Sequence, residues 1–169
     1  QQYPTKPVRV VIVFAPGGGT DIVGRIVSEK GGEQLGQQFV VENRAGAAGM
    51  IGAEVVAKSP PDGYTLMIYT QTMLVNAHIY KKTPYDPLKS FVGITSLTRL
   101  VNALVVHPSM PVRTTKDLLA LAKSRPGEIA YGSSGVGGVQ HLSTSLFASM
   151  MGVKLNHVPF KGGAPAVVA

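Results

Sequence analysis

The stretch Val8-Arg9-Val10-Val11-Ile12-Val13-Phe14-Ala15-Pro16-Gly17-Gly18-Gly19-Thr20-Asp21 decides the fold. Its first half, residues 8–14, is a nearly unbroken β-branched run, which predicts a strand buried on both faces. The glycines that follow allow positive φ and predict a turn into a helix over residues 20–35. Thr20 or Asp21 is the expected N-cap of that helix.

The helix over residues 20–35 has the period of an amphipathic helix, with an apolar stripe formed by Ile22, Val23, Ile26 and Val27. Gly31 and Gly32 interrupt it, and each is expected to cost about 1 kcal/mol of helix stability. A second strand, residues 38–42, follows at once. The first two strands therefore belong to a βαβ unit and should be parallel.

The rest of the chain continues the alternation of helices and strands. Residues 46–58 are helical in their later half, and residues 64–69 form a third strand. Two extended pieces, residues 91–97 and 103–107, bracket a polar crossover at residues 98–102, and residues 115–123 form a helix. This alternation predicts an α/β fold.

The opening pattern returns near the end of the chain. A strand over residues 129–131, a small-residue loop over 132–138, a helix over 139–151 and a strand over 154–159 occur in the same order. The last strand leads into the start of another helix. We therefore predict two similar lobes: lobe 1 over residues 1–101, without its returning segment, and the first part of lobe 2 over residues 102–169.

Composition excludes several classes of protein. The 169 residues include no Cys, which rules out disulfides, thiolate metal sites and cysteine nucleophiles, and the 4 His residues are too dispersed to predict a metal site. The net charge of +7 comes from scattered basic residues without interleaved aromatic residues, so we predict no nucleic-acid partner. No apolar run reaches the ~18 to 20 residues that span a bilayer, so we predict no membrane insertion. Residues 1–7 resemble a mature N-terminus from which a signal peptide has been removed.

Two of the predicted loops follow strands in lobe 1, where an open α/β sheet binds ligands. The amide groups of residues 16–21, at a helix N-terminus, suit an anion, although a tight turn is the simpler interpretation. Neither a Walker loop nor a dinucleotide fingerprint fits the spacing of these glycines. Residues 69–72 end a strand in polar side chains, which suit a selective pocket, although Thr70 or Thr72 could instead cap a helix.

The third loop, in lobe 2, carries two serines. Residues 132–138 nearly match a nucleophile elbow, but Val136 stands where its last glycine is required. Ser134 with His141 therefore gives an alternative from another class, a serine hydrolase, although no acidic residue follows Glu128 to complete a triad. Ser133 and Ser134 could equally donate to a carboxylate. The remaining histidines are interpreted as structural or exposed.

Six ordered blocks give a more specific indication than any single loop. They are residues 3–7 (YPTKP), 13–21 (VFAPGGGTD), 41–49 (VENRAGAAG), 61–66 (PDGYTL), 84–87 (PYDP) and 157–162 (HVPFKG). Together they resemble the Bug family, the periplasmic solute-binding receptors of tripartite tricarboxylate transporters. The resemblance covers the whole chain, and family chains run well past Ala169.

The resemblance implies a periplasmic-binding-protein-like fold, a Venus flytrap whose two lobes close over a small carboxylate. It implies that the first loop holds one carboxylate end and that Asp21 orders this loop and water. The ligand-binding residues that it implies are Phe14, Gly18, Gly19, Thr20, Asp21, Ala48, Thr70, Gln71, Thr72, Ser133, Ser134, Val136, Gly137, His141, Gly163 and Ala164.

The prediction from sequence is thus a non-enzymatic periplasmic receptor. It is expected to bind a mono-, di- or tricarboxylate without a cofactor, to be a monomer, and to deliver its ligand to the membrane components of a tripartite tricarboxylate transporter.

Overall fold

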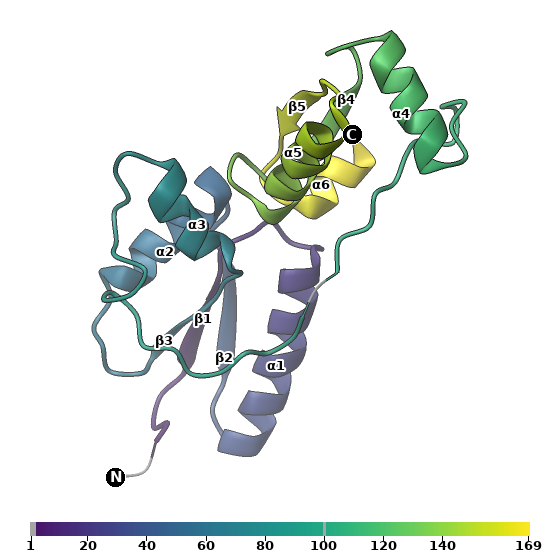
Figure 1. Cartoon of the computed structure of the whole chain (residues 1–169). Helices are drawn as coiled ribbons and strands as arrows, with labels where there is room; N and C mark the ends of the chain where they lie inside the picture. The colour runs from purple at the N-terminus through teal and green to yellow at the C-terminus, as the bar shows by residue number, and fades with distance from the viewer. Residues whose placement is uncertain (1–2, 100) are drawn as a thin grey trace.

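A computed structural model describes residues 3–99 and 101–169; Gln1, Gln2 and Leu100, which falls within the predicted crossover, lie outside it. Two separate parallel sheets organise the chain. Lobe 1 is used below for the part built on the first sheet, and lobe 2 for the part built on the second (Figure 1). The boundary between residues 101 and 102 remains a prediction.

The sheet of lobe 1 has the order β2-β1-β3, formed by Val8–Ile12 (β1), Phe39–Asn43 (β2) and Thr65–Ile68 (β3). All its pairs are parallel, with Val10 opposite Val41 and Leu66, which confirms the βαβ prediction. The central strand β1 is buried as its β-branched run predicts, although it ends at Ile12 and not at Phe14.

Helix α1, Gly19–Leu35, lies on one side of this sheet, and α2, Met50–Ala57, and α3, Thr72–Ile79, lie on the other (Figure 1). A short 3-10 turn, η1 (Ala47–Gly49), precedes α2. The main cluster of buried side chains on that side is Met50, Ala53 and Tyr85. Helix α3 is absent from the sequence prediction, which interpreted this region as a pocket wall or a helix cap.

Three of the four residues of the apolar stripe predicted for α1 face away from the sheet, and the fourth, Val23, is half-buried. Ile22, Ile26 and Val27 are 40–57% exposed, whereas Asp21, Gly24 and Ser28 are buried. A Cβ at Gly24 would lie 2.6 Å from Ile12 Cδ1, so small residues let the helix approach the sheet closely. The helix also runs unbroken through Gly31 and Gly32.

The cap predicted for α1 is also wrong. Gly18 is the N-cap residue and no side chain caps the helix, because Thr20 and Asp21 already lie within its first turn. The N–H groups of this turn therefore have no side-chain acceptor at the cap.

Lobe 2 contains Ala130–Ser133 (β4) paired in parallel with Asn156–Pro159 (β5), together with Thr115–Ser124 (α4), Val139–Met151 (α5) and Gly163–Val168 (α6). Helix α5 has the predicted bounds, and both strands are shorter or shifted by a few residues. Helix α4 begins with a capping box formed by Thr114 and Asp117.

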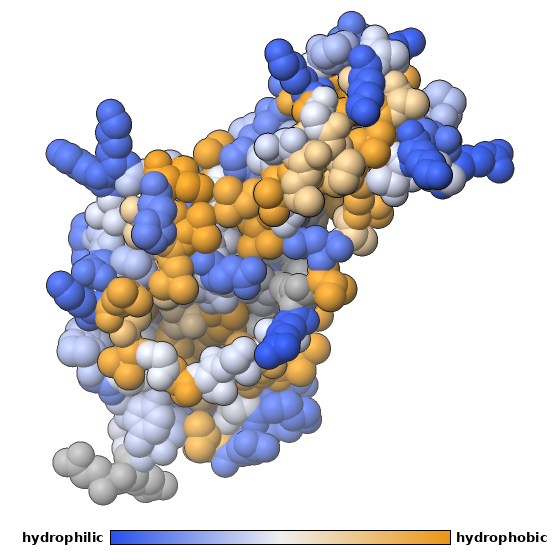
Figure 2. Space-filling model, in the orientation of Figure 1, coloured by the Kyte–Doolittle hydropathy of each residue, from blue (hydrophilic) through white to orange (hydrophobic). Residues whose placement is uncertain are grey.

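The extended pieces predicted at residues 91–97 and 103–107 form no strands, because no described segment pairs with them. Their apolar side chains stay exposed, as Val92 at 92% and Val105 at 71% illustrate. Figure 2 shows apolar side chains over much of one face of the molecule. Among the described residues, none of the helices has the length and apolar character needed to cross a membrane.

Candidate functional site

The two lobes meet where loops at the ends of their strands approach one another. Ala15 N donates to Lys161 O at 3.2 Å, and Tyr80 Oη donates to Val136 O at 3.0 Å. Together with close backbone approaches, these bonds join residues 15–17, 47–49 and 76–80 of lobe 1 to residues 133–138 and 161–164 of lobe 2. This meeting place is called the loop junction below.

Four positive-φ glycines line the loop junction. A Cβ at Gly17 would lie 3.7 Å from Ala164 Cβ, and one at Gly162 would lie 3.1 Å from Ala15 Cβ. A Cβ at Gly135 would lie 3.5 Å from Ala48 N, and one at Gly137 would lie 3.0 Å from Asn76 Oδ1. The backbones of the two lobes thus come close together because these positions carry no side chain.

Asp21 organises the lobe 1 loop through both carboxylate oxygens. Oδ2 accepts from Gly17 N at 2.9 Å and from Arg25 Nε at 3.0 Å, and Oδ1 accepts from Asn43 Nδ2 at 2.8 Å. Burial acts to raise the pKa of Asp21, but the hydrogen bonds from Arg25, Asn43 and Gly17 outweigh it and hold the pKa below its usual value. Asp21 is therefore an anion that fixes the loop.

Asn43 extends this network, since its Nδ2 also donates to Phe14 O at 3.0 Å. Arg25 completes it by donating to Asn43 Oδ1 at 3.0 Å. Sequence reasoning missed both residues. Asn43 stands in the VENRAGAAG block, but only the pairing of β1 with β2 places it beside the first loop.

Neutral groups hold the lobe 2 loop. Buried Ser133 shares a 2.6 Å hydrogen bond with His157 Nε2, and Gly137 N donates to His141 Nδ1 at 3.1 Å. The two imidazole rings stack with centroids 4.1 Å apart. Burial, and then the neighbouring His141, lower the pKa of His157. His157 is thus part of the loop's support, which its sequence interpretation as structural or exposed did not specify.

The serine–histidine pair required by the hydrolase alternative does not form. Ser134 Oγ donates to Gln140 Oε1 at 2.6 Å, and His141 is engaged by the Gly137 amide. Helix α5, like α1, has a glycine N-cap without a side-chain cap, here Gly138. The two ends of the loop junction therefore offer amide groups of the kind that bind anions.

The remaining predicted residues divide between the loop junction and its edge. Ala48 and Ala164 lie at the junction, and Val136 contributes its carbonyl there although its side chain is 41% exposed. Thr72 is buried and shares a 2.8 Å hydrogen bond with Thr70, whereas Gln71 is an exposed N-cap without a side-chain bond. Thr70, Gln71 and Thr72 therefore do not cap α3 through their side chains.

Phe14, Gly18, Gly19, Thr20 and Gly163 complete the predicted set. Phe14 is buried with its ring edge-on to Tyr69, and Gly18, Gly19 and Thr20 form the start of α1. Gly163 is the first residue of α6. Their contact with a ligand remains a prediction.

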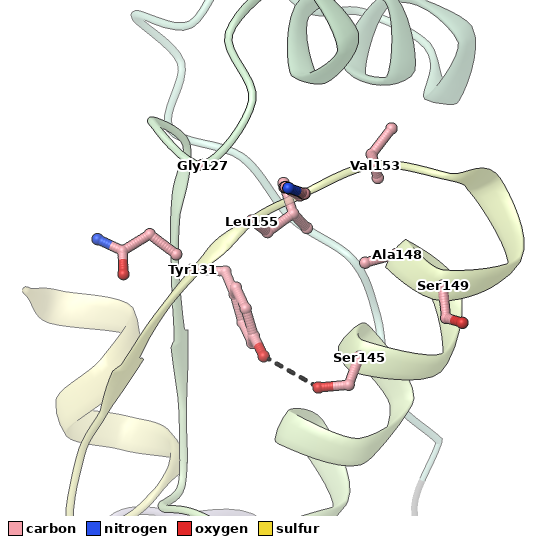
Figure 3. A pocket seen from close by; sticks show the side chains of 9 residues that line it. Gly127, Tyr131, Ser145, Ala148, Ser149, Val153 and Leu155 are labelled. Atoms are coloured by element: carbon pink, nitrogen blue, oxygen red, sulfur yellow. Dashed lines mark hydrogen bonds between the residues drawn. The ribbon is translucent and has the colours of Figure 1, made fainter.

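A hollow of about 510 Å³ lies elsewhere, between β5 and the end of α5 (Figure 3). Tyr131, Ser145 and Val153 are among its lining residues, and Tyr131 Oη lies 3.3 Å from Ser145 Oγ. No group of three or more acidic, histidine or cysteine side chains suited to a metal ion occurs within residues 3–99 and 101–169.

Comparison with protein families supports the resemblance found in the sequence. The family described as "Tripartite tricarboxylate transporter family receptor" matches residues 23–169. A UPF0065 protein from the tcbD-tcbE intergenic region of Pseudomonas sp. strain P51 is 39% identical over 98% of this chain and 49% of the relative. Protein BugT of Bordetella pertussis is 37% identical over 98% of this chain and 52% of its own length. The chain thus spans about half the length of these relatives.

Comparison with solved structures indicates the same family. Rpa4515 of R. palustris, determined with adipate, is similar with a TM-score of 0.95 and 41% identity over 98% of this chain and 56% of that one. The periplasmic binding protein BugD gives a TM-score of 0.86 and 34% identity, with coverages of 98% and 56%. MatC of Rhodopseudomonas palustris, with bound malate, gives a TM-score of 0.83 and 28% identity, with coverages of 99% and 57%. The predicted periplasmic-binding-protein-like fold is confirmed.

Proposed function

Because this chain belongs to the tripartite tricarboxylate transporter receptor family, we propose that the intact protein captures a small carboxylate at the loop junction. It would act in the periplasm as a monomer and deliver its ligand to the membrane components of a tripartite transporter. Adipate and malate, both dicarboxylates, are the ligands of two similar proteins, and they support a small carboxylate as the ligand class. Whether monocarboxylates or tricarboxylates also bind is part of the proposal. A serine hydrolase is not retained, because the family is one of receptors and not of enzymes.

The observation that carries the proposal is the pair of uncapped helix N-termini, of α1 and α5, on the two sides of the loop junction. Each helix follows a glycine-rich loop that is held in place by the side-chain hydrogen bonds described above. Free backbone N–H groups at a helix start bind a carboxylate, and the helix dipole adds to this attraction. Closure of the lobes would then remove both ends of a short carboxylate from water.

Calorimetric titration of the intact protein tests the proposal. A panel that includes acetate, malate, adipate and citrate should give a saturable heat for at least one compound. Absence of binding across the panel would contradict the proposed ligand class. Sedimentation of the liganded protein would test whether it is a monomer.

A further inference from the structure

The turn at Ala47–Gly49 has a backbone that alanine rarely adopts. Ala47 has φ 47°, Ala48 has φ 51° and Gly49 has φ 91°, so three successive residues are left-handed. Glycine adopts this conformation freely, but for alanine the Cβ crowds the neighbouring carbonyl oxygen. Two alanines remain left-handed only if surrounding contacts hold them there.

Two side chains supply those contacts by donating to one carbonyl. Tyr69 Oη donates to Ala48 O at 2.7 Å, and Asn76 Nδ2 donates to the same oxygen at 3.2 Å. Asn76 Nδ2 also donates to Tyr69 Oη at 3.0 Å. Burial raises the pKa of Tyr69, so its hydroxyl keeps the proton that it donates.

The orientation of Asn76 is fixed by these bonds. Its side chain is fully buried, and a flipped amide would place Oδ1 against the Ala48 carbonyl, which cannot donate. Oδ1 is consequently left without a hydrogen-bond partner among the described residues and faces Gly137 across the loop junction. The molecule thus leaves one buried acceptor unsatisfied while both donors serve the turn and Tyr69.

The left-handed turn brings the Ala48 amide close to lobe 2. Ala48 is 4% exposed, and a Cβ at Gly135 would lie 3.5 Å from Ala48 N. Among the described residues, no backbone carbonyl accepts a hydrogen bond from Ala48 N–H. A buried amide without an acceptor is costly, so this N–H is suited to a ligand oxygen that enters between the lobes.

We propose that Tyr69 and Asn76 are positioning residues for ligand binding, which hold the Ala47–Ala48 turn left-handed so that Ala48 N–H can donate to a bound carboxylate. This inference rests on the proposed function, because it takes the ligand to be a carboxylate at the loop junction. Neither side chain needs to touch the ligand. Each acts through the backbone of the turn.

Removing the stronger donor tests the inference. In the intact protein, Tyr69→Phe keeps the ring against Phe14 but loses the bond to Ala48 O and the bond from Asn76 Nδ2. We expect affinity for adipate or malate to fall about tenfold by calorimetry. The near-isosteric variant Asn76→Leu should lower the same affinity about threefold. Asn76→Leu is used as the test variant if Tyr69→Phe does not fold. Tyr64→Phe, which loses only bonds to Thr5, is the matched control and should bind normally.

Rescue by glycine separates positioning from simple packing. Ala48→Gly removes the strain at the turn, so Tyr69→Phe with Ala48→Gly should recover most of the lost affinity. The inference is overturned if Tyr69→Phe binds like wild type, or if the double variant is no better than Tyr69→Phe.

A readout without ligand distinguishes failure of the inference from failure of the proposed function. Hydrogen exchange at Gly49 N and Met50 N, which bond to Gly46 O and Ala47 O, should quicken in Tyr69→Phe and slow again in the double variant. If wild type binds no carboxylate but exchange changes in this way, the proposed function fails while the support of the turn stands. Unchanged exchange would refute the positioning role itself.

Discussion

The two loops that meet between the lobes are built on one plan but held by different chemistry. Each follows a parallel strand, is rich in glycine and ends at a helix with a glycine N-cap. The lobe 1 loop is fixed by an ionised cluster, the pair of Asp21 with Arg25, to which the neutral amide of Asn43 also bonds. The lobe 2 loop is fixed by neutral hydroxyl and imidazole groups, Ser133, His157 and His141.

This difference has consequences for how each loop tolerates change. Hydrogen bonds to charged groups contribute about 1.5–3 kcal/mol each, roughly twice the neutral value. The lobe 1 loop should therefore be stiffer and more sensitive to loss of its anion. The conformation of the lobe 2 loop should change more readily with pH and with the shape of the ligand.

Loss of the lobe 1 anion should have the largest effect. Asp21→Ala leaves Gly17 N–H and the Arg25 and Asn43 donors without their acceptor, so affinity for all carboxylates should fall about 10- to 100-fold in calorimetry. Asp62→Ala, at an exposed carboxylate paired with Lys6, serves as control. Unchanged affinity in Asp21→Ala would show that the ionised cluster is not needed.

A methyl group at the lobe 2 loop should have the next largest effect. Gly137 has φ +81° and a Cβ there would lie 3.0 Å from Asn76 Oδ1, so Gly137→Ala should hinder closure and weaken binding about tenfold. Gly127→Ala is matched in backbone, at φ +83°, but its Cβ would meet nothing within 4 Å. Gly127→Ala should lower Tm and leave affinity unchanged; equal losses of affinity in both would refute the steric explanation.

Smaller changes should alter preference among ligands. Thr70→Val removes a neutral hydroxyl bonded to Thr72, at a cost of about 1 kcal/mol, or roughly fivefold, to those carboxylates that the hydroxyl contacts. A panel of mono-, di- and tricarboxylates should change rank order. The control is Thr83→Val, which removes a hydroxyl that donates to Tyr85 O. If Thr70→Val lowered the affinity for all carboxylates equally, Thr70 would have a structural role only.

The smallest expected effect is a difference between the two loops in how their contribution to stability changes as the pH falls. The pKa of His157 is lowered from 6.5, so the stability that its neutral form supplies is present above pH 6.5 and is lost as pH falls toward the lower folded pKa. The pKa of Asp21 is lowered from 3.8, so its contribution is lost only below that pH. Tm should decline modestly between pH 7 and 5, and His157→Gln should flatten this decline. An identical slope in the variant would contradict the assignment.

The same contrast separates what sequence could predict from what it could not. The β-branched run of residues 8–12 and the helix at residues 139–151 follow from local pattern alone, and both loops were identified because glycines end a strand there. Asn43 was missed, and the partner of His157 was not specified, because strand pairing brings these residues to loops 29 and 24 residues away in the chain.

Tertiary packing also reversed one local inference. The exposed stripe residues Ile22, Ile26 and Val27 have a helical period, yet the sheet packs against the side of α1 that carries Gly24 and Ser28. The helix packs on this side because Gly24 allows its backbone to come close to Ile12. A hydrophobic pattern does not indicate how closely a helix backbone can approach a sheet. Residues 91–97 likewise have strand-like composition, but a strand requires a neighbour, and none pairs with them in the described chain.

The sparse join between the lobes has a kinetic consequence. In the described chain only two hydrogen bonds cross it, from Ala15 N to Lys161 O and from Tyr80 Oη to Val136 O, and the glycines there contribute little side-chain surface. Separating the two lobes at this junction would therefore break few contacts of the described chain, and we expect the dwell time of the proposed carboxylate to depend mainly on the contacts that the ligand itself makes. We expect carboxylates of different length to enter at similar rates and to leave at very different ones.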